Sequence, residues 1–305
     1  MDKVIEIKNL TKVFKNGRGI TDINLDIHRS EIFGFLGPNG AGKTTAMKIM
    51  TGLTKPDSGD VKILGFSILE QFEKAMAKVG CIIETAESYP YMTAYENLKQ
   101  FSRYYEGVDN KRIEEVLELT GILKYKNENS RKFSLGMKQR LGLALALMGE
   151  PEFLILDEPI NGLDPTGIIE IRNLLLKLNR EKNITILISS HILTELSNIA
   201  TTYGFLDKGI LIEQITAEKL SEKCNTYLDI SVTDTKKYCA LLETKLSCDN
   251  YKVMPENHIR IFDINKKMED YSSLAVLNGI GLLSMEEKRI DLENYYMNLI
   301  ESVNE

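Results

Sequence analysis

The sequence of 305 residues predicts an α/β fold with a mainly parallel core sheet, followed by a small α+β domain. The main observation is a set of short, continuous apolar runs, each followed by a segment with helical spacing. Strands that are buried on both faces in this way are typical of parallel sheets covered by helices. The runs are Ile32–Leu36, Phe153–Leu156 and Ile184–Ile188.

The N-terminal segment has the alternation of half-buried strands instead of a continuous apolar run. Apolar and polar residues alternate over Ile5–Ile7 and Ile23–Ile27, and Gly17–Gly19 supplies a turn between them. We therefore expect an N-terminal antiparallel β-subdomain beside the core sheet. A helix should follow the first core strand at Thr44–Met50.

Residues 69–126 are predicted to be mostly helical, and a helical subdomain is expected over about 85–150. Thr93 and Glu96 form a capping box, in which a hydroxyl and a carboxylate three residues apart satisfy exposed backbone donors. Asp164 followed by Pro165 is typical of an N-cap and a first helical position. The expected helices are Ala94–Tyr105, Ile113–Leu119 (stopped by Gly121), Met137–Met148, Pro165–Asn179 and His191–Ala200.

The first domain, residues 1–214, is expected to end near Gln214, where the character of the sequence changes. Residues 215–305 have the predicted order β-α-β-β-α-β, which is typical of a small ferredoxin-like unit. Its expected elements are Tyr227–Val232, Lys236–Lys245, Tyr251–Met254, His258–Phe262, Lys267–Leu277 and Ile280–Met285, with a hairpin turn at Glu256-Asn257.

Charge and composition disfavour several classes of protein. The net charge of −6 argues against a general nucleic-acid-binding protein, because such a protein needs a basic face. No apolar run approaches the roughly 18 residues of a membrane helix, and the N-terminus lacks an apolar signal core. The cysteines form no C-x-x-C pair and no metal set with a nearby histidine, so we expect reduced thiols at Cys81, Cys224, Cys239 and Cys248.

A glycine-rich segment after the first core strand matches the phosphate-binding pattern G-x-x-x-x-G-K-[ST]. Glycine lets the backbone approach a ligand, and the following helix turns the positive end of its dipole towards an anion. Lys43 is expected to reach the β- and γ-phosphates of ATP, and Thr44 to hold Mg²⁺. The predicted nucleotide cradle consists of Gly37, Pro38, Asn39, Gly40, Ala41, Gly42, Lys43, Thr44 and Thr45. An ordinary glycine-rich turn is the alternative, and the flanking strand and helix argue against it.

Two carboxylates end the second core strand. Ligands of open α/β sheets bind at the carboxyl ends of the strands. Asp157 is therefore placed to hold Mg²⁺, and Glu158 to accept a proton from, or to orient, an attacking water. Such a strand end alone is usually solvated surface, but together with the phosphate loop it predicts a P-loop NTPase.

Further segments resemble the ATP-binding subunits of ABC transporters, in the order in which that family has them. Residues 133–140, FSLGMKQR, resemble the signature loop that is usually written LSGGQ, and residues 161–165, NGLDP, resemble the D-loop. His191 after Ser189-Ser190 resembles the switch histidine, and Phe14 falls where an aromatic residue stacks on adenine. The resemblance covers residues from about 4 to 214.

The resemblance implies that two copies pair head to tail with ATP at each interface. Ser134 and Gly136 of one copy would donate hydrogen bonds to the γ-phosphate bound by the other, although Ser134 is equally typical of a helix N-cap. Asp164 would link the two sites. The implied catalytic residues are Glu158, His191 and Lys43. The implied partners are a second ATP-binding subunit, in a homodimer, and multi-span permease subunits, at the cytoplasmic face of the membrane.

The sequence departs from the family pattern in two places. The signature reads FSLGM, which keeps the serine and the second glycine. Glu84 stands where most relatives have a glutamine that touches Mg²⁺ and the attacking water and lines the groove for the permease's cytoplasmic helix. An ionised carboxylate only accepts hydrogen bonds, whereas an amide also donates. We expect Glu84 at the nucleotide and metal site, and a solvent-facing Glu84 is the alternative.

Glu84, the chain length and the C-terminal extension resemble exporters for immunity to lantibiotics and resistance to bacitracin. The hypothesis is therefore an ATPase that energises removal of an antimicrobial peptide or drug from the membrane. The alternative is a soluble ABC ATPase acting on ribosomes or DNA, which usually carries two ATP-binding units, long coiled coils or zinc motifs. A P-loop kinase would leave the signature and D-loop segments unexplained.

Overall fold

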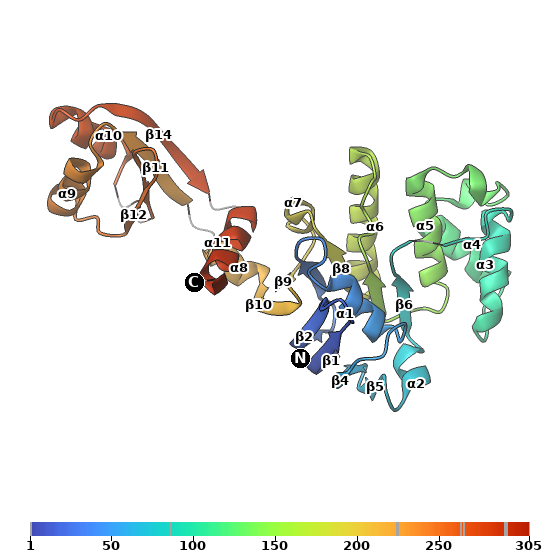
Figure 1. Cartoon of the computed structure of the whole chain (residues 1–305). Helices are drawn as coiled ribbons and strands as arrows, with labels where there is room; N and C mark the ends of the chain where they lie inside the picture. Colours follow the sequence, from blue (N-terminus) through green and yellow to red (C-terminus); the bar gives the residue numbers. More distant parts are fainter. Residues whose placement is uncertain are drawn as a thin grey trace. The chain divides into compact units, whose positions relative to one another are not determined.

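The chain divides into two compact units, Met1–Ala217 and Glu218–Glu305. The structure is a computed structural model that describes residues 2–85, 87–223, 226–262, 264, 266–289 and 292–304 (Figure 1). Cys81, Cys239 and Cys248 are free thiols, and Cys224 lies outside the described residues. In the part of the chain that is described, no helix is long and apolar enough to cross a bilayer.

A six-stranded sheet of order β10-β9-β3-β8-β7-β6 forms the centre of the first unit. The pairs β9-β3, β3-β8, β8-β7 and β7-β6 are parallel, and β10 is antiparallel to β9, which confirms the predicted sheet. Every residue of β3, β7 and β8 is buried, as the continuous apolar runs predicted. The strands are β3 (Ile32–Leu36), β6 (Val79–Ile82), β7 (Phe153–Leu156), β8 (Thr185–Ser190), β9 (Thr202–Asp207) and β10 (Ile210–Thr216).

A second, antiparallel sheet of order β2-β1-β4-β5 confirms the predicted N-terminal β-subdomain. Its strands are β1 (Lys3–Val13), β2 (Gly19–His28), β4 (Ser58–Ile63) and β5 (Phe66–Ser67). The sequence analysis missed β4 and β5, because β5 spans two residues and β4 buries only Val61 and Ile63. The core of this region joins the inner faces of β1 and β2 to α1 (Lys43–Met50).

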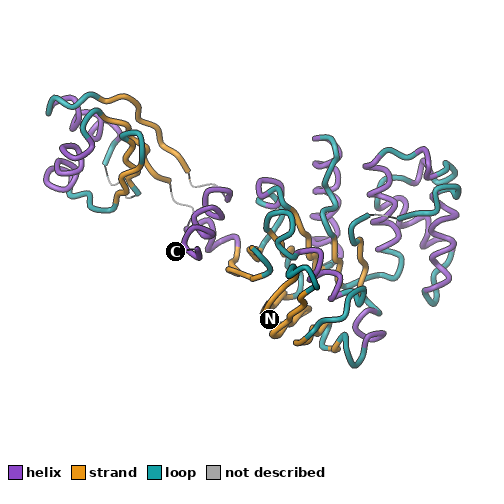
Figure 2. Tube along the Cα trace, in the orientation of Figure 1, coloured by secondary structure: helices purple, strands orange, loops and turns teal. Residues whose placement is uncertain are grey.

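Helices α3 (Ala94–Phe101), α4 (Asn110–Leu119) and α5 (Leu135–Ala146) pack against one another and form a helical region (Figure 2). The Thr93 hydroxyl accepts from the Glu96 N–H at 3.1 Å and the Glu96 carboxylate accepts from the Thr93 N–H at 2.8 Å, so the capping box is confirmed. The prediction that residues 69–126 are mostly helical is only partly right. The short helix α2 (Phe72–Met76) is followed by strand β6 and an irregular segment before α3.

The prediction of a helix over His191–Ala200 is wrong, because α7 contains only Leu193–Leu196. Ile192 has extended backbone angles, and the Ser190 hydroxyl accepts from the Ile192 N–H at 2.9 Å, which makes a turn in place of a first helical turn. His191 therefore lies in the connection after β8. Asp164 caps α6 (Pro165–Lys182) as predicted, and the helix runs beyond the predicted end at Asn179.

The second unit has an antiparallel sheet of order β12-β13-β11-β14, and from β11 to β14 its elements follow the predicted order β-α-β-β-α-β, with one further helix before them and one after them. Glu256 and Asn257 both have positive φ, as the tight turn between β12 and β13 requires. Tyr238 of α9 donates its hydroxyl to the backbone oxygen of Tyr271 in α10 at 2.9 Å, which ties the two helices together. The elements are α8 (Ala217–Lys223), β11 (Thr226–Val232), α9 (Thr235–Leu246), β12 (Tyr251–Met254), β13 (His258–Ile261), α10 (Met268–Leu277), β14 (Leu282–Arg289) and α11 (Leu292–Asn304).

Candidate functional site

The glycine-rich segment joins the carboxyl end of β3 to helix α1. Gly42 is the N-cap of α1 with φ 110°, and no side chain caps the helix, so the first backbone N–H groups remain available to an anion. A Cβ at Gly37 would lie 2.2 Å from the Leu206 backbone oxygen. A Cβ at Gly42 would lie 2.6 Å from the Ile20 side chain. Glycine is required at both positions for the loop to fit against its neighbours.

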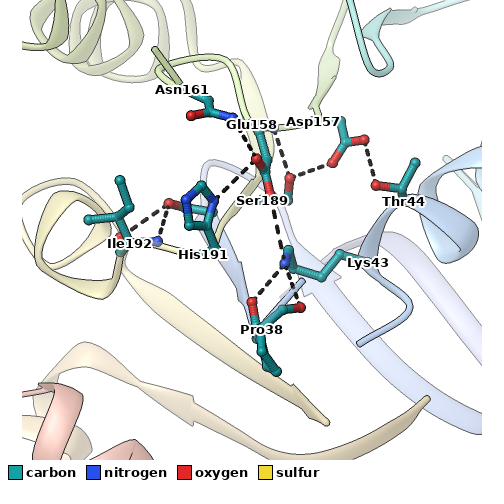
Figure 3. A network of polar contacts seen from close by, with 11 residues as sticks. Pro38, Lys43, Thr44, Asp157, Glu158, Asn161, Ser189, His191 and Ile192 are labelled. Atoms are coloured by element: carbon teal, nitrogen blue, oxygen red, sulfur yellow. Dashed lines mark hydrogen bonds and ion pairs between the residues drawn. The ribbon is translucent and has the colours of Figure 1, made fainter. Parts of the chain in front are cut away.

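Lys43 is buried at the centre of this loop, with 4% of its surface exposed. Its ammonium group donates to the backbone oxygens of Gly37 at 2.7 Å and Pro38 at 3.2 Å, and lies 3.8 Å from Glu158 Oε1 (Figure 3). Burial lowers the pKa of Lys43, and the carboxylates of Glu158 and Asp157 partly oppose this effect. The loop thus holds a cation that an incoming polyphosphate can neutralise.

Asp157 and Thr44 meet where the carboxyl end of β7 faces the start of α1. The Thr44 hydroxyl donates to Asp157 Oδ2 at 2.8 Å, and Ser189 of β8 donates to Asp157 Oδ1 at 2.6 Å. Ser189 Oγ also accepts from the Glu158 N–H at 2.9 Å. This chain of hydrogen bonds fixes the two carboxylates relative to the phosphate loop (Figure 3).

Glu158 has a positive φ of 47°, an uncommon conformation for a residue with a side chain. Its carboxylate accepts from Asn161 Nδ2 at 3.1 Å and lies 3.2 Å from His191 Nδ1. That histidine nitrogen is buried and makes no hydrogen bond to any residue that the structure describes. Lys43, Glu158 and His191, which were predicted separately, therefore lie in one cluster.

A cavity of about 260 Å³ lies over the phosphate loop. Phe14 is 41% exposed and lines this cavity beside the loop, so its ring is accessible for stacking on an adenine base. Six of the nine predicted cradle residues line this cavity, and Gly37, Pro38 and Ala41 do not. The lining residues are Phe14, Asn16, Arg18, Gly19, Asn39, Gly40, Gly42, Lys43, Thr44, Thr45 and Glu158.

Among the described residues, Glu84 makes no hydrogen bond or ion pair with Thr44 or Asp157, the other predicted metal-binding residues. It follows β6 with a φ of 66°, and its carboxylate accepts from Lys48 Nζ of α1 at 2.7 Å. It nevertheless shares a cavity of about 660 Å³ with Thr44, Asp157 and Glu158. The structure thus places Glu84 at the rim of the site, held by an ion pair that the sequence analysis did not predict.

Ser134, Gly136 and Asp164 lie in a different cavity, of about 330 Å³, between the start of α5 and the start of α6. Ser134 Oγ accepts from the Met137 N–H at 3.3 Å, so the N-cap interpretation holds in the single chain. This cavity and the cavity over the phosphate loop have no lining residue in common. Each set of predicted residues thus lines a cavity of its own, and the 660 Å³ cavity shares Thr44 and Glu158 with the first and Leu135 with the second.

Three residues that contribute to the site were not among the predicted site residues. Ser189 and Asn161 contact the two carboxylates, and Lys48 binds Glu84. A signal existed for Ser189, because a serine that ends a buried parallel strand lies at the same sheet edge as Asp157. No local signal identifies Lys48, because its partner comes 36 positions later.

The residues present fit a magnesium nucleotide. The uncapped start of α1 suits phosphate, and His191 Nδ1, which lies 3.2 Å from Glu158 but makes no hydrogen bond to a described residue, is a buried polar atom that a ligand would satisfy. The Thr44 hydroxyl and Asp157 carboxylate are the hard oxygen ligands that Mg²⁺ prefers, usually one or two per site together with phosphates. No described group of three or more acidic, histidine or cysteine side chains forms a complete metal site. When bound, the metal supplies positive charge next to the terminal phosphate.

We expect Glu84→Gln to lower ATP turnover by roughly twofold to tenfold without abolishing it, because a change at one rim hydrogen bond amounts to about 1 kcal/mol. The variant loses the ion pair to Lys48 but keeps the contacts of Asp157 and Glu158. Steady-state ATPase measurements check this, with Lys48→Met as the matched variant for the other half of the pair. A loss of more than about a hundredfold would contradict the rim position of Glu84, because a loss of that size is expected for a general base in contact with the reacting groups.

Comparison with known proteins agrees with this geometry. The profile of the ABC transporter family matches residues 20–161. The bacitracin transport ATP-binding protein BcrA of Enterococcus faecalis is 41% identical over 98% of this chain and 97% of its own length. The lantibiotic transport ATP-binding protein SrtF of Streptococcus pyogenes is 38% identical over 74% of this chain and 97% of its own.

Solved structures show the same fold. A dimeric bacterial ABC transporter cassette has a TM-score of 0.63 and 27% identity, covering 70% of this chain and 98% of the cassette. CbiO1 of Clostridium perfringens, part of the CbiONQ ABC transporter complex, has a TM-score of 0.66 and 26% identity, covering 81% of this chain and 97% of its own. The shared fold, the phosphate loop and the full-length similarity lead to one conclusion: this chain is an ATP-binding subunit of the ABC transporter family.

Proposed function

We propose that two copies of this chain pair head to tail, bind Mg-ATP between them and use its hydrolysis to energise export of an antimicrobial peptide through permease subunits. The observation that carries the pairing is the separation of the two cavities within one chain. The phosphate loop, His191 and Glu158 form one half of a site, and Ser134, Gly136 and Asp164 form the other. A second copy would complete each half.

Within the pair, each residue has a chemical role that its position supports. Lys43 and the α1 N–H groups hold the phosphates, and Thr44 with Asp157 holds Mg²⁺, the latter commonly through water. Glu158 orients the attacking water or takes its proton, and His191 contacts the terminal phosphate. The start of α5 at Ser134 and Gly136, which the Ser134 hydroxyl caps in the single chain, would supply N–H donors from the partner copy.

A groove of about 1190 Å³ between α2 and the helical region is the proposed contact for a permease, although Glu84, whose position was expected to line the permease groove, does not line it. Phe72 and Tyr104 expose aromatic surface there, at 43% and 77%. The rim is acidic, since it carries Glu73, Glu106, Asp109, Glu115 and Glu150 against Lys78 and Arg112. We propose a short amphipathic helix with basic residues as the occupant, because its charge and its apolar face complement the groove.

The proposed substrate class rests on the relatives named for bacitracin and lantibiotic transport. Deletion of the gene for this chain should make its host more sensitive to bacitracin or to at least one lantibiotic. Restoring the wild-type gene should restore resistance, whereas a Glu158→Gln allele should not. Unchanged sensitivity across a panel of such peptides would contradict the substrate class without touching the ATPase assignment.

A further inference from the structure

The turn between β1 and β2 has a fixed conformation that projects Arg18. The Phe14 N–H donates to the Arg18 backbone oxygen at 2.8 Å, and the Gly17 N–H donates to the Phe14 oxygen at 2.9 Å. Asn16 Oδ1 accepts from the Arg18 N–H at 3.1 Å. Gly17 has a φ of 77°, which a residue with a side chain rarely adopts. The turn is thus defined by its own hydrogen bonds.

The same turn is fastened to the phosphate loop through the β9–β10 connection. The Thr21 N–H donates to the Gly209 oxygen at 2.8 Å, and the Gly209 N–H donates to the Ala41 oxygen at 2.9 Å. A Cβ at Gly19 would lie 1.8 Å from the Lys12 backbone oxygen, so the backbone approaches too closely there for any side chain. The position of Arg18 relative to the phosphate loop is therefore set by backbone contacts.

Arg18 lines the cavity over the phosphate loop together with Phe14, Lys43 and Thr45. Its side chain is exposed, and among the described residues no carboxylate forms an ion pair with its guanidinium group. The cavity contains two cations, Arg18 and Lys43, and one carboxylate, Glu158. Arg18 is thus an uncompensated positive charge on the wall of the nucleotide cavity.

We propose that Arg18 binds the α-phosphate of the nucleotide, an inference that rests on the proposed ATP binding. Lys43 is expected to bind the terminal phosphate, because it lies 3.8 Å from Glu158, where hydrolysis is expected. Phe14 is expected to stack on the adenine base at the other end of the nucleotide. Arg18 belongs to the same turn as Phe14 and lines the same cavity as Lys43 and Thr45, so we assign it the phosphate between these two ends. A guanidinium group donates two parallel hydrogen bonds to phosphate oxygens, which suits it to this task.

The test compares adenosine, which has no phosphate, with AMP, which has only the α-phosphate, and with ATP. Binding of adenosine, AMP and ATP to the full chain is measured by competition with a fluorescent ATP analogue in the wild type, Arg18→Gln and Arg18→Lys. Arg18→Gln should weaken binding of AMP and ATP by about tenfold, the effect of a charge-assisted hydrogen bond, and leave adenosine binding unchanged. Arg18→Lys should recover part of the loss, because it keeps the charge but not the paired donors.

Lys15→Gln is the matched control, since Lys15 is an exposed cation in the same turn that does not line the cavity. An equal loss in Lys15→Gln would overturn the proposal in favour of general electrostatic attraction. An equal loss for adenosine and AMP, or no loss for either, would also overturn it. Unfolding midpoints without ligand verify that the variants are folded. If the wild type itself fails to bind ATP, the proposed function fails and not this inference alone.

Discussion

Glu158→Gln should lower the rate of ATP hydrolysis by about 10²- to 10⁴-fold, the usual range for loss of a general base, while Mg-ATP binding persists. The amide keeps the shape of the side chain at the end of β7 but cannot accept a proton. The hydrogen bonds that position the proposed nucleotide-binding groups, from Lys43 to Gly37 and from Thr44 to Asp157, do not involve the Glu158 carboxylate. The variant should therefore accumulate the ATP-bound state.

Steady-state phosphate release and equilibrium binding of a fluorescent ATP analogue measure the two halves of this expectation. Glu70→Gln is a suitable control, because Glu70 is exposed on the first unit and outside every cavity of the site. If Glu158→Gln kept more than about a tenth of the wild-type rate, another group would have to activate the water, and the role given to Glu158 would be wrong.

Lys43→Met should remove the stabilisation that Mg-ATP gives to the folded protein. For the wild type, ligand at one hundred times its dissociation constant raises the free energy of unfolding by about 2.7 kcal/mol. Met fills a similar volume but offers neither charge nor hydrogen bonds at the loop centre, where Lys43 Nζ now binds Gly37 and Pro38. Thermal unfolding with and without Mg-ATP is the measurement. A ligand-induced rise that survives in the variant would contradict the assignment of the phosphate site.

The same lysine gives the ligand-free protein a pH dependence of known sign. Burial lowers the pKa of Lys43 from the ordinary value of 10.5, so in the alkaline window just below 10.5 the unfolded chain binds more protons than the folded chain. The contribution of Lys43 to the free energy of unfolding therefore rises with pH through that window, whereas Cys81 and Tyr105, whose pKa values are raised by desolvation, contribute with the opposite sign. Lys43→Met lacks the buried ammonium group, so its free energy of unfolding should rise less than that of the wild type over the same pH window.

The parts of the fold that the sequence predicted are those determined by local patterns. The runs at β3, β7 and β8 are buried at every position, so their hydrophobicity is continuous and readable. The cap at Thr93 and the cap at Asp164 each depend on residues three positions away. The strand pair β4–β5 was missed, because a two-residue strand carries no period.

The candidate site was predictable in its residue types but not in its contacts. The phosphate-loop pattern and the carboxylates after β7 identified the nucleotide end of the sheet. The ion pair between Lys48 and Glu84 depends on how β6 and α1 lie in space, and no sequence period encodes that distance. Likewise, the short α7 results from the Ser190 hydroxyl competing for the Ile192 N–H, which apolar spacing alone does not reveal.

The separation of the two half-sites has a consequence for the behaviour of the chain at different concentrations. If hydrolysis requires two copies, its rate follows the square of the subunit concentration when pairing is weak. A dilute copy without permease neighbours would then bind ATP without hydrolysing it. Gathering two subunits under one membrane assembly would raise their effective concentration and switch hydrolysis on only where a transport pathway exists.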